Sequence, residues 1–181
     1  SFQAFSSINY PDLGVLRDGV LLRYIRQDCA DVPAFCDTLD TKVALLKLTP
    51  GQDRAAVDFF LERNDALIIE SFGVGGLPCY EQADFLSAAS AWSSAGKPIV
   101  ITTQVPHEGS DLAVYQVGAR VAAQPGILQA YTMTAEAVVT KLMWILPQTR
   151  DLAQIKRLFY TPIACDLLLF EEHGQHTDES N

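Results

Sequence analysis

The chain has 181 residues, of which 49% are hydrophobic and 19% are charged, and its formal net charge is −9. These values exclude a disordered or fibrous chain and favour one globular domain, with at most a short appendage, that buries a substantial core. A uniformly acidic chain without clustered Lys and Arg is a poor nucleic-acid binder, so we expect no nucleic-acid partner. The apolar runs are far shorter than the ~20 residues of a membrane helix, so we expect no membrane partner.

The four cysteines suggest neither a metal site nor a redox site. None forms a C-x-x-C pair, and no group of Cys and His has the spacing of zinc ligands. Reduced thiols are typical of the cytosol, so we expect a cytoplasmic protein.

The first 40 residues predict little regular structure. Turn signals such as Asn9-Tyr10-Pro11-Asp12 make residues 1–18 irregular, and only residues 19–25 are expected to form a short strand. We therefore interpret residues 1–40 as an interdomain linker with a short strand. Residues 41–170 are the predicted α/β domain, and residues 171–181 are a polar tail.

Strands and helices alternate from residue 42 onward. Apolar runs predict buried strands at 42–48, 66–70, 98–103 and 126–130. Helical stripes or caps predict helices at 54–63, 81–95, 112–123, 134–146 and 151–160, with Thr134 as an N-cap and Gly96 as a C-terminal cap. Continuous apolar strands indicate burial on both faces, so the fold class is α/β: a three-layer α/β/α sandwich around a roughly four-stranded parallel sheet, similar to flavodoxin or Rossmann domains.

A ligand in such a fold is expected outside the carboxyl ends of the strands. These ends are the loops at 49–52, 71–79, 103–111 and 131–133. The first candidate is the glycine loop Gly73-Val74-Gly75-Gly76, which follows a strand and precedes a helix. It matches neither G-x-G-x-x-G nor a P-loop. The simplest interpretation is a tight turn in which Gly73 or Gly75 has a positive φ; contact with a phosphate, a small polar ligand or another subunit is the alternative.

Three other groups of residues receive structural interpretations. Ser110, His107 and Asp111 lie close together in sequence, but no G-x-S-x-G elbow surrounds the serine, so we interpret them as a polar loop whose Ser110 or Asp111 caps the next helix. Lys141 is expected to face solvent, although burial in an apolar stretch could lower its pKa. The aromatic residues at helical spacing are expected in the core: Phe59, Phe60, Phe85, Trp92 and Trp144.

Four ordered segments resemble the C-terminal half of the L-asparaginase family, type I branch. They are Ala66-Leu67-Ile68-Ile69-Glu70-Ser71-Phe72-Gly73-Val74-Gly75-Gly76-Leu77-Pro78, Pro98-Ile99-Val100-Ile101-Thr102-Thr103-Gln104, Tyr115-Gln116-Val117-Gly118, and Met133-Thr134-Ala135-Glu136-Ala137 leading into Thr140-Lys141-Leu142-Met143-Trp144. Ala4-Phe5-Ser6-Ser7-Ile8-Asn9 also resembles the stretch that joins the two domains of that family. The resemblance runs over roughly residues 4–168.

The resemblance implies amide hydrolysis, L-asparagine plus water giving L-aspartate and ammonia, without a metal or organic cofactor. The family's catalytic threonines lie in a larger N-terminal domain, in signatures of the T-G-G-T and H-G-T-D-T kind, and neither occurs here. We therefore expect no catalytic residue in this chain and no activity of the chain alone. The smaller domain's role is to cover an active site at a subunit interface and to build a homo-oligomer, a dimer or tetramer. The expected interface residues are Gly73, Gly75, Gly76, Thr103 and Gln104.

Departures from the family pattern bear on regulation. Gly76 stands where many relatives have an Asn that approaches the neighbouring subunit's active site, and Thr132 stands where they have Asp. Relatives that asparagine regulates have Arg at the position of Glu70 and a Cys near Val105, so an effector site of that type is in doubt here. A Glu70 carboxylate would repel the α-carboxylate of an amino acid.

Two other interpretations remain open. The chain could be a non-catalytic α/β binding module, or it could belong to the amidase subunit of a tRNA-dependent amidotransferase, which shares this architecture. We also expect the isolated domain to form a dimer, because Leu77, Pro78, Val105 and Pro106 give the loops at 71–79 and 103–111 apolar character.

Overall fold

A computed structural model describes residues 8, 10–26, 32, 35–78, 84–112, 120 and 122–168. Its main body is a four-stranded parallel sheet in the order β3-β4-β5-β6. The strands are β3 (Val43–Lys47), β4 (Ala66–Ser71), β5 (Ile99–Thr103) and β6 (Ile127–Gln129). The helices are α1 (Ala55–Arg63), α2 (Phe85–Ser94), α4 (Ala135–Ile145) and α5 (Leu152–Phe159).

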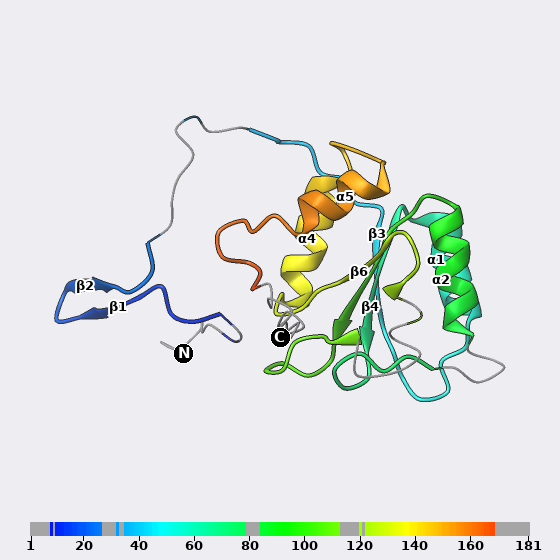
Figure 1. Ribbon diagram of the computed structural model, residues 1–181, viewed down its shortest axis with the longest axis horizontal. Helices are drawn as coiled ribbons and strands as arrows, with labels where there is room; N and C mark the ends of the chain where they lie inside the picture. Colours follow the sequence, from blue (N-terminus) through cyan, green and yellow to red (C-terminus); the bar gives the residue numbers. More distant parts are fainter. Residues whose placement is uncertain are drawn as a thin grey trace, which may run out of the picture.

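The sheet is covered on both sides, as the continuous apolar strands predict. Helices α1 and α2 lie on one side of it, and α4 and α5 lie on the other (Figure 1). Alternate residues of each strand point to opposite faces: Leu67 and Ile69 pack with the α1–α2 layer, whereas Ala66 and Ile68 pack with the α4–α5 layer. The three-layer α/β/α fold is confirmed.

Local signals set most helix ends where they were expected. Thr134 caps α4 by accepting a hydrogen bond from the main-chain N–H of Ala137, and Asp151 caps α5 in the same way through Gln154. Gly96 follows α2 with a φ of 69°, the left-handed conformation that glycine adopts easily. The helix predicted at 112–123 and the polar tail at 171–181 lie largely or wholly outside the described residues.

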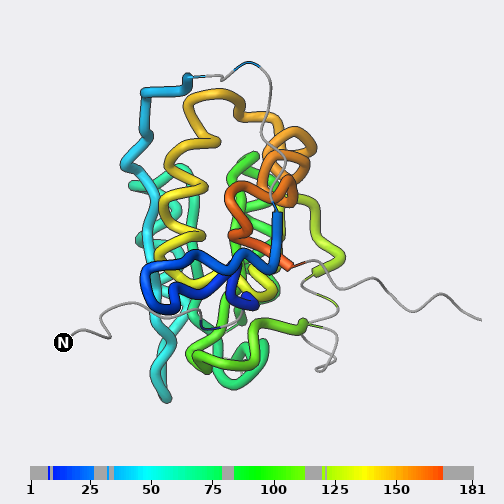
Figure 2. Tube along the Cα trace, turned by 90° about the vertical axis from the view of Figure 1, so that its left-hand side faces the viewer, coloured from blue at the N-terminus to red at the C-terminus, as the bar shows by residue number. Residues whose placement is uncertain are grey.

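The irregular segment predicted at residues 1–18 is wrong in its last part. Residues Gly14–Arg17 form β1, which pairs antiparallel with β2 (Val20–Arg23). The loop between them has two residues, Asp18 and Gly19, with φ values of 47° and 77°. Positive φ at both positions is typical of a type I′ turn, whose twist suits a hairpin. The hairpin lies outside the layers of the main body (Figures 1 and 2).

Two predictions about side-chain burial are also wrong. Phe59 is 52% exposed, because it lies on the outer side of α1 beside Arg63 rather than in the core. Lys141 is buried: its Nζ lies 2.8 Å from a carboxylate oxygen of Asp166 and donates to the carbonyl oxygen of Thr161. Phe85 and Trp92 are in the core as expected.

Candidate functional site

The loops that follow β4 and β5 meet at the carboxyl edge of the sheet, the lower edge in Figure 1. The hydroxyl of Thr103 donates to the carbonyl oxygen of Gly73, and it accepts from the main-chain N–H of Val105 at 2.9 Å. The two loops are thus joined directly by a side chain at the end of β5. The topology brings them together because β4 and β5 are parallel neighbours.

The glycine loop is a tight turn, and the predicted positive φ is confirmed at both glycines. Gly73 has a φ of 50° and Gly75 has a φ of 154°. The main-chain N–H groups of Gly75 and Gly76 both donate to the carbonyl oxygen of Phe72, which closes the turn. A Cβ at Gly75 would lie 2.9 Å from the carbonyl oxygen of Asp111, so this position also lets the two loops approach closely.

Gln104 fastens the start of the second loop to two strands. Its side-chain amide donates to the carbonyl oxygens of Leu48 (2.8 Å) and Glu70 (3.0 Å), at the ends of β3 and β4. The Gln104 side chain therefore adds a donor for two main-chain acceptors at the end of the sheet, one of which, the carbonyl oxygen of Glu70, also accepts from the N–H of Leu48.

A third loop, which follows β6, joins the same assembly. The N–H of Ser110 donates to the carbonyl oxygen of Tyr131, and the side chain of Gln129 both donates to the carbonyl oxygen of Ser110 and accepts from the N–H of Leu112. The N–H of Gln129 in turn donates to the phenol oxygen of Tyr160 at 2.9 Å, and burial raises the pKa of Tyr160 to about 12. Sequence reasoning missed Gln129, although a glutamine that ends an apolar strand is a signal of this kind.

Two hollows flank the joined loops. One, of about 280 Å³, is lined by Thr103 and Gln104 together with Lys47, Glu70 and Glu136, among others. The other is a wider, mainly apolar hollow of about 600 Å³ lined by Pro50, Gly51, Phe72, Gly73, Gly76, Leu77 and Pro78. Four of the five predicted site residues therefore line a hollow, whereas Gly75 is buried between the loops.

The smaller hollow combines both signs of charge. The ammonium of Lys47 lies 3.9 Å from the carboxylate of Glu70, whose side chain is mostly buried. Glu136, in the first turn of α4, adds a second carboxylate. The lining of this hollow therefore includes one lysine and two glutamate side chains.

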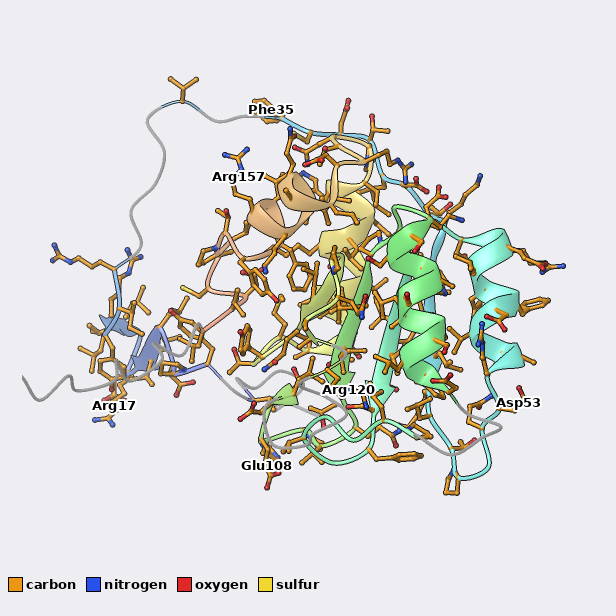
Figure 3. The ribbon with its side chains drawn as sticks, turned by 45° about the vertical axis from the view of Figure 1, so that its right-hand side comes forward. Arg17, Phe35, Asp53, Glu108, Arg120 and Arg157 are labelled. Carbon is orange, nitrogen blue, oxygen red and sulfur yellow. The ribbon has the colours of Figure 1, made fainter. Side chains whose placement is uncertain are left out.

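The polar loop contains no Ser–His pair among the described residues. The Ser110 hydroxyl is buried and has no hydrogen-bond partner within that part of the chain, whereas His107 is exposed. The helix that Ser110 or Asp111 was expected to cap lies mainly outside the described residues. Figure 3 shows Glu108 on this loop, at the edge of the body.

The apolar character expected of the loops is only partly present. Leu77 and Pro78 are buried and Val105 is half-buried, so among these four residues only Pro106 is exposed. Leu77 packs in the core beneath the glycine loop instead of facing outward. The apolar surface at this edge is therefore smaller than the sequence suggested.

The part of the chain that the structure describes contains neither a candidate metal site nor a candidate membrane-spanning helix. Its residues contain no group of three or more Cys, His, Asp and Glu side chains that could hold a metal ion. Within the same ranges, no helix is long and apolar enough to cross a membrane.

Known proteins share both the sequence and the fold of this chain. The sequence model of the glutaminase/asparaginase C-terminal domain family matches residues 42–159. An L-asparaginase from Thermococcus kodakarensis is 38% identical over 165 residues, which are 91% of this chain and 49% of that protein. One subunit of a glutamyl-tRNA(Gln) amidotransferase from Pyrococcus horikoshii is 28% identical over 169 residues, which are 91% of this chain and 37% of that protein.

Solved structures agree. The thermostable L-asparaginase from Thermococcus kodakarensis superposes with a TM-score of 0.84 at 33% identity, over 94% of this chain and 51% of that one. L-asparaginase I from Vibrio cholerae superposes with a TM-score of 0.71 at 24% identity, over 92% of this chain and 50% of that one, which shows a shared fold. The α/β body is thus a domain of the kind found in amide hydrolases. This chain belongs to the glutaminase/asparaginase C-terminal domain family. It spans about half the length of the L-asparaginase relative.

Proposed function

We propose that this chain is the C-terminal domain of an L-asparaginase-like amidohydrolase, which converts L-asparagine and water to L-aspartate and ammonia. The observation that carries the proposal is the joined pair of loops, 72–76 and 103–112, at the carboxyl edge of a domain of this family. Their role is to cover an active site that another part of the enzyme supplies, and to contribute to a subunit interface.

The residues at the carboxyl edge of the sheet are better suited to covering an active site than to catalysing the reaction. Amide hydrolysis needs an activated nucleophile and donors placed for the developing oxyanion. The Thr103 hydroxyl is already committed to Gly73 and Val105, and the Ser110 hydroxyl is buried. Gly73 and Gly76, in contrast, line an apolar hollow. Because glycine has no side chain, another backbone can approach the main chain closely at these two positions.

An activity assay of a fusion enzyme tests this proposal. The half of the Thermococcus kodakarensis L-asparaginase that this chain does not match is joined in front of Ser1, and ammonia release from L-asparagine is measured. We expect turnover by the fusion and none by the 181-residue chain alone, because the chain lacks both threonine signatures. The matched control is a fusion with the first threonine of its T-G-G-T signature changed to alanine. Turnover by the 181-residue chain, or a folded fusion without turnover, contradicts the proposal.

A second candidate is the amidase subunit of a tRNA-dependent amidotransferase, which the similarity to the amidotransferase subunit from Pyrococcus horikoshii favours. The L-asparaginase assignment is better supported, because identity to that relative is higher over a similar share of the chain. In addition, a net charge of −9 disfavours RNA contacts by this part of the protein. Ammonia release from L-glutamine that rises when glutamyl-tRNA(Gln) is added supports the second candidate; release from L-asparagine unaffected by tRNA supports the first.

Location and assembly form part of the same proposal. We place the enzyme in the cytoplasm, because the spacing of the four cysteines follows no disulfide pattern. The assembly is a homo-oligomer, a dimer or tetramer, in which the edge of one copy covers the site of another. Light scattering of the active fusion measures this assembly, and a mass of one copy at all concentrations contradicts it.

A further inference from the structure

Three side chains that line the smaller hollow form one row across the sheet. The register pairs Lys47 with Glu70 and Glu70 with Thr102, so the three lie side by side on neighbouring strands. Ile68 and Val100, two positions earlier on β4 and β5, pack in the α4–α5 layer, so Glu70 and Thr102 point to that same face. The apolar face of the sheet thus ends in a polar row that borders the hollow of about 280 Å³.

Glu70 is a mostly buried carboxylate with little to pair with. Its side chain is 17% exposed, and among the described residues only its main-chain oxygen accepts hydrogen bonds. The ion contact to Lys47 is 3.9 Å long, and the lysine side chain is 63% exposed. A carboxylate taken out of water costs free energy unless it is hydrogen-bonded as well as paired. The Glu70 carboxylate therefore has acceptor capacity that the described part of the chain does not use.

Thr102 adds a second group of this kind. It is 2% exposed, and its carbonyl oxygen accepts a hydrogen bond from the Ser71 hydroxyl at 2.7 Å. The Thr102 hydroxyl itself has no hydrogen-bond partner in the ranges that the structure describes, whereas buried hydroxyls normally have one. Because Thr102 lines the hollow, a ligand there can bond to this hydroxyl.

The rest of the lining is apolar or acidic. Val105, Met133 and Ala135 supply hydrocarbon, and Glu136 supplies a second carboxylate from the first turn of α4, which begins at this edge of the sheet (Figure 1). A carboxylate in the first turn offsets the partial positive charge of a helix N-terminus, so the start of α4 does not make this an anion site. Two carboxylates and one ammonium leave the charged lining with a net negative charge.

We propose that this hollow binds a small aliphatic molecule through a primary ammonium group. The ammonium donates hydrogen bonds to the Glu70 carboxylate and the Thr102 hydroxyl, and the aliphatic chain packs against Val105 and Met133. A volume of about 280 Å³ is at the lower end of the range of ligand pockets, which suits a ligand of few heavy atoms. The site uses no residue of the apolar hollow beside the glycine loop, so the proposal goes beyond the proposed function and does not rest on it.

The charge of the lining selects among amines. An α-amino acid brings its own carboxylate toward Glu70 and Glu136, and like charges at such distances repel. A diamine instead brings a second ammonium, which Glu136 can attract. Short aliphatic diamines are therefore expected to bind more tightly than amino acids.

Calorimetric titration of the 181-residue chain with 1,4-diaminobutane tests the site. We expect saturable binding of one molecule per chain, with a Kd about 10-fold or more below that of L-asparagine. 1,4-Butanediol keeps the chain length but carries no charge, and it is expected not to bind. Failure of the diamine to bind, or equally tight binding of L-asparagine or the diol, overturns the proposal.

Substitutions distinguish the hollow from the acidic surface as a whole. Glu70→Gln is expected to weaken diamine binding about 10-fold or more, and Thr102→Val about 3-fold or more. Glu62→Gln is the matched control: it removes the same charge from an exposed side chain of α1 and is expected to leave the Kd unchanged. Equal losses in Glu70→Gln and Glu62→Gln show that the diamine follows only the net charge of −9, which overturns the site.

Two readouts separate ligand binding from a structural role. Thr102→Val is expected not to lower the Tm, because the hydroxyl bonds to no described residue; a lower Tm means that the hydroxyl serves the fold and counts against the proposal. Amide chemical shifts of the unaltered chain locate the diamine without any substitution. The largest changes are expected at Thr102, Val105 and Ala135, and largest changes elsewhere contradict binding in this hollow.

Discussion

The hydroxyl of Thr103 donates a hydrogen bond to the carbonyl oxygen of Gly73 and so joins the loops that follow β4 and β5. The same oxygen accepts the N–H of Val105, which makes Thr103 the shared point of both loops. A tight glycine turn has few side chains of its own to hold it. The position of the glycine loop therefore depends on a residue of the neighbouring strand.

Replacing Thr103 with Val removes both hydrogen bonds and keeps the β-branched shape. We expect the free energy of unfolding to fall by about 1 kcal/mol, since the exposed carbonyl of Gly73 and the half-buried N–H of Val105 both lose the Thr103 hydroxyl. Urea unfolding followed by circular dichroism measures the change. Thr140→Val is the matched control, because that hydroxyl bonds only to carbonyls of its own helix on an exposed face. Equal effects of the two substitutions contradict the role given to Thr103.

Gly75 is expected to be the least replaceable glycine of the loop. Gly75→Ala combines a φ of 154° with a Cβ 2.9 Å from a backbone oxygen of Asp111, and we expect a loss of about 2 kcal/mol or more. Gly96→Ala is the control: its φ is 69°, but its Cβ enters open space, so only about 1 kcal/mol is expected. Thermal unfolding compares the two. A smaller loss at Gly75 than at Gly96 means that the loops separate easily.

The sheet and its carboxyl edge could be predicted from sequence because their signals are local. An apolar run bounded by Pro50-Gly51 marks β3, and Gly73 to Gly76 mark a turn wherever the chain goes afterwards. The hairpin was also visible in principle, since Asp18-Gly19 between apolar residues is a strong signal for a two-residue turn. It was missed because turn residues at Pro11 and Gly14 make the preceding segment look irregular.

Burial of single residues depends on contacts that sequence does not display. Lys141 has the composition of a surface residue, yet Asp166, 25 positions later, reaches it from the segment after α5. Leu77 and Pro78 follow a turn, yet Leu77 packs into the core. The same holds for Gln129, whose partners Ser110 and Leu112 come from a different loop.

The buried pair of Lys141 and Asp166 is expected to hold the segment after α5 against α4. Lys141→Met leaves the Asp166 carboxylate, which is only 18% exposed, without its cation, and we expect a loss of about 3 kcal/mol. Lys156→Met, on the exposed side of α5, should change stability by less than about 0.5 kcal/mol. Chemical denaturation measures both.

The double variant Lys141→Met with Asp166→Asn separates a lost ion pair from lost packing. It removes the unpaired charge, so it should be more stable than Lys141→Met alone. If the double variant is less stable than the single one, the carboxylate is not the source of the loss.

The buried phenol of Tyr160, which bonds to β6 through Gln129, is expected to make the free energy of unfolding depend on pH in the alkaline range. Burial raises the pKa of Tyr160 to about 12, and its phenol oxygen accepts the N–H of Gln129. Since the ordinary pKa is about 10, the folded state favours the neutral phenol. This contribution is fully present below pH 10 and is lost as pH rises from 10 to 12.

Tyr160→Phe has no such group, so its free energy of unfolding should fall less steeply across that window. Tyr24→Phe, at an exposed ring, is the control and should keep the wild-type slope. Urea unfolding at several pH values gives the slopes, and identical slopes for Tyr160→Phe and the wild type rule out a neutral, buried phenol.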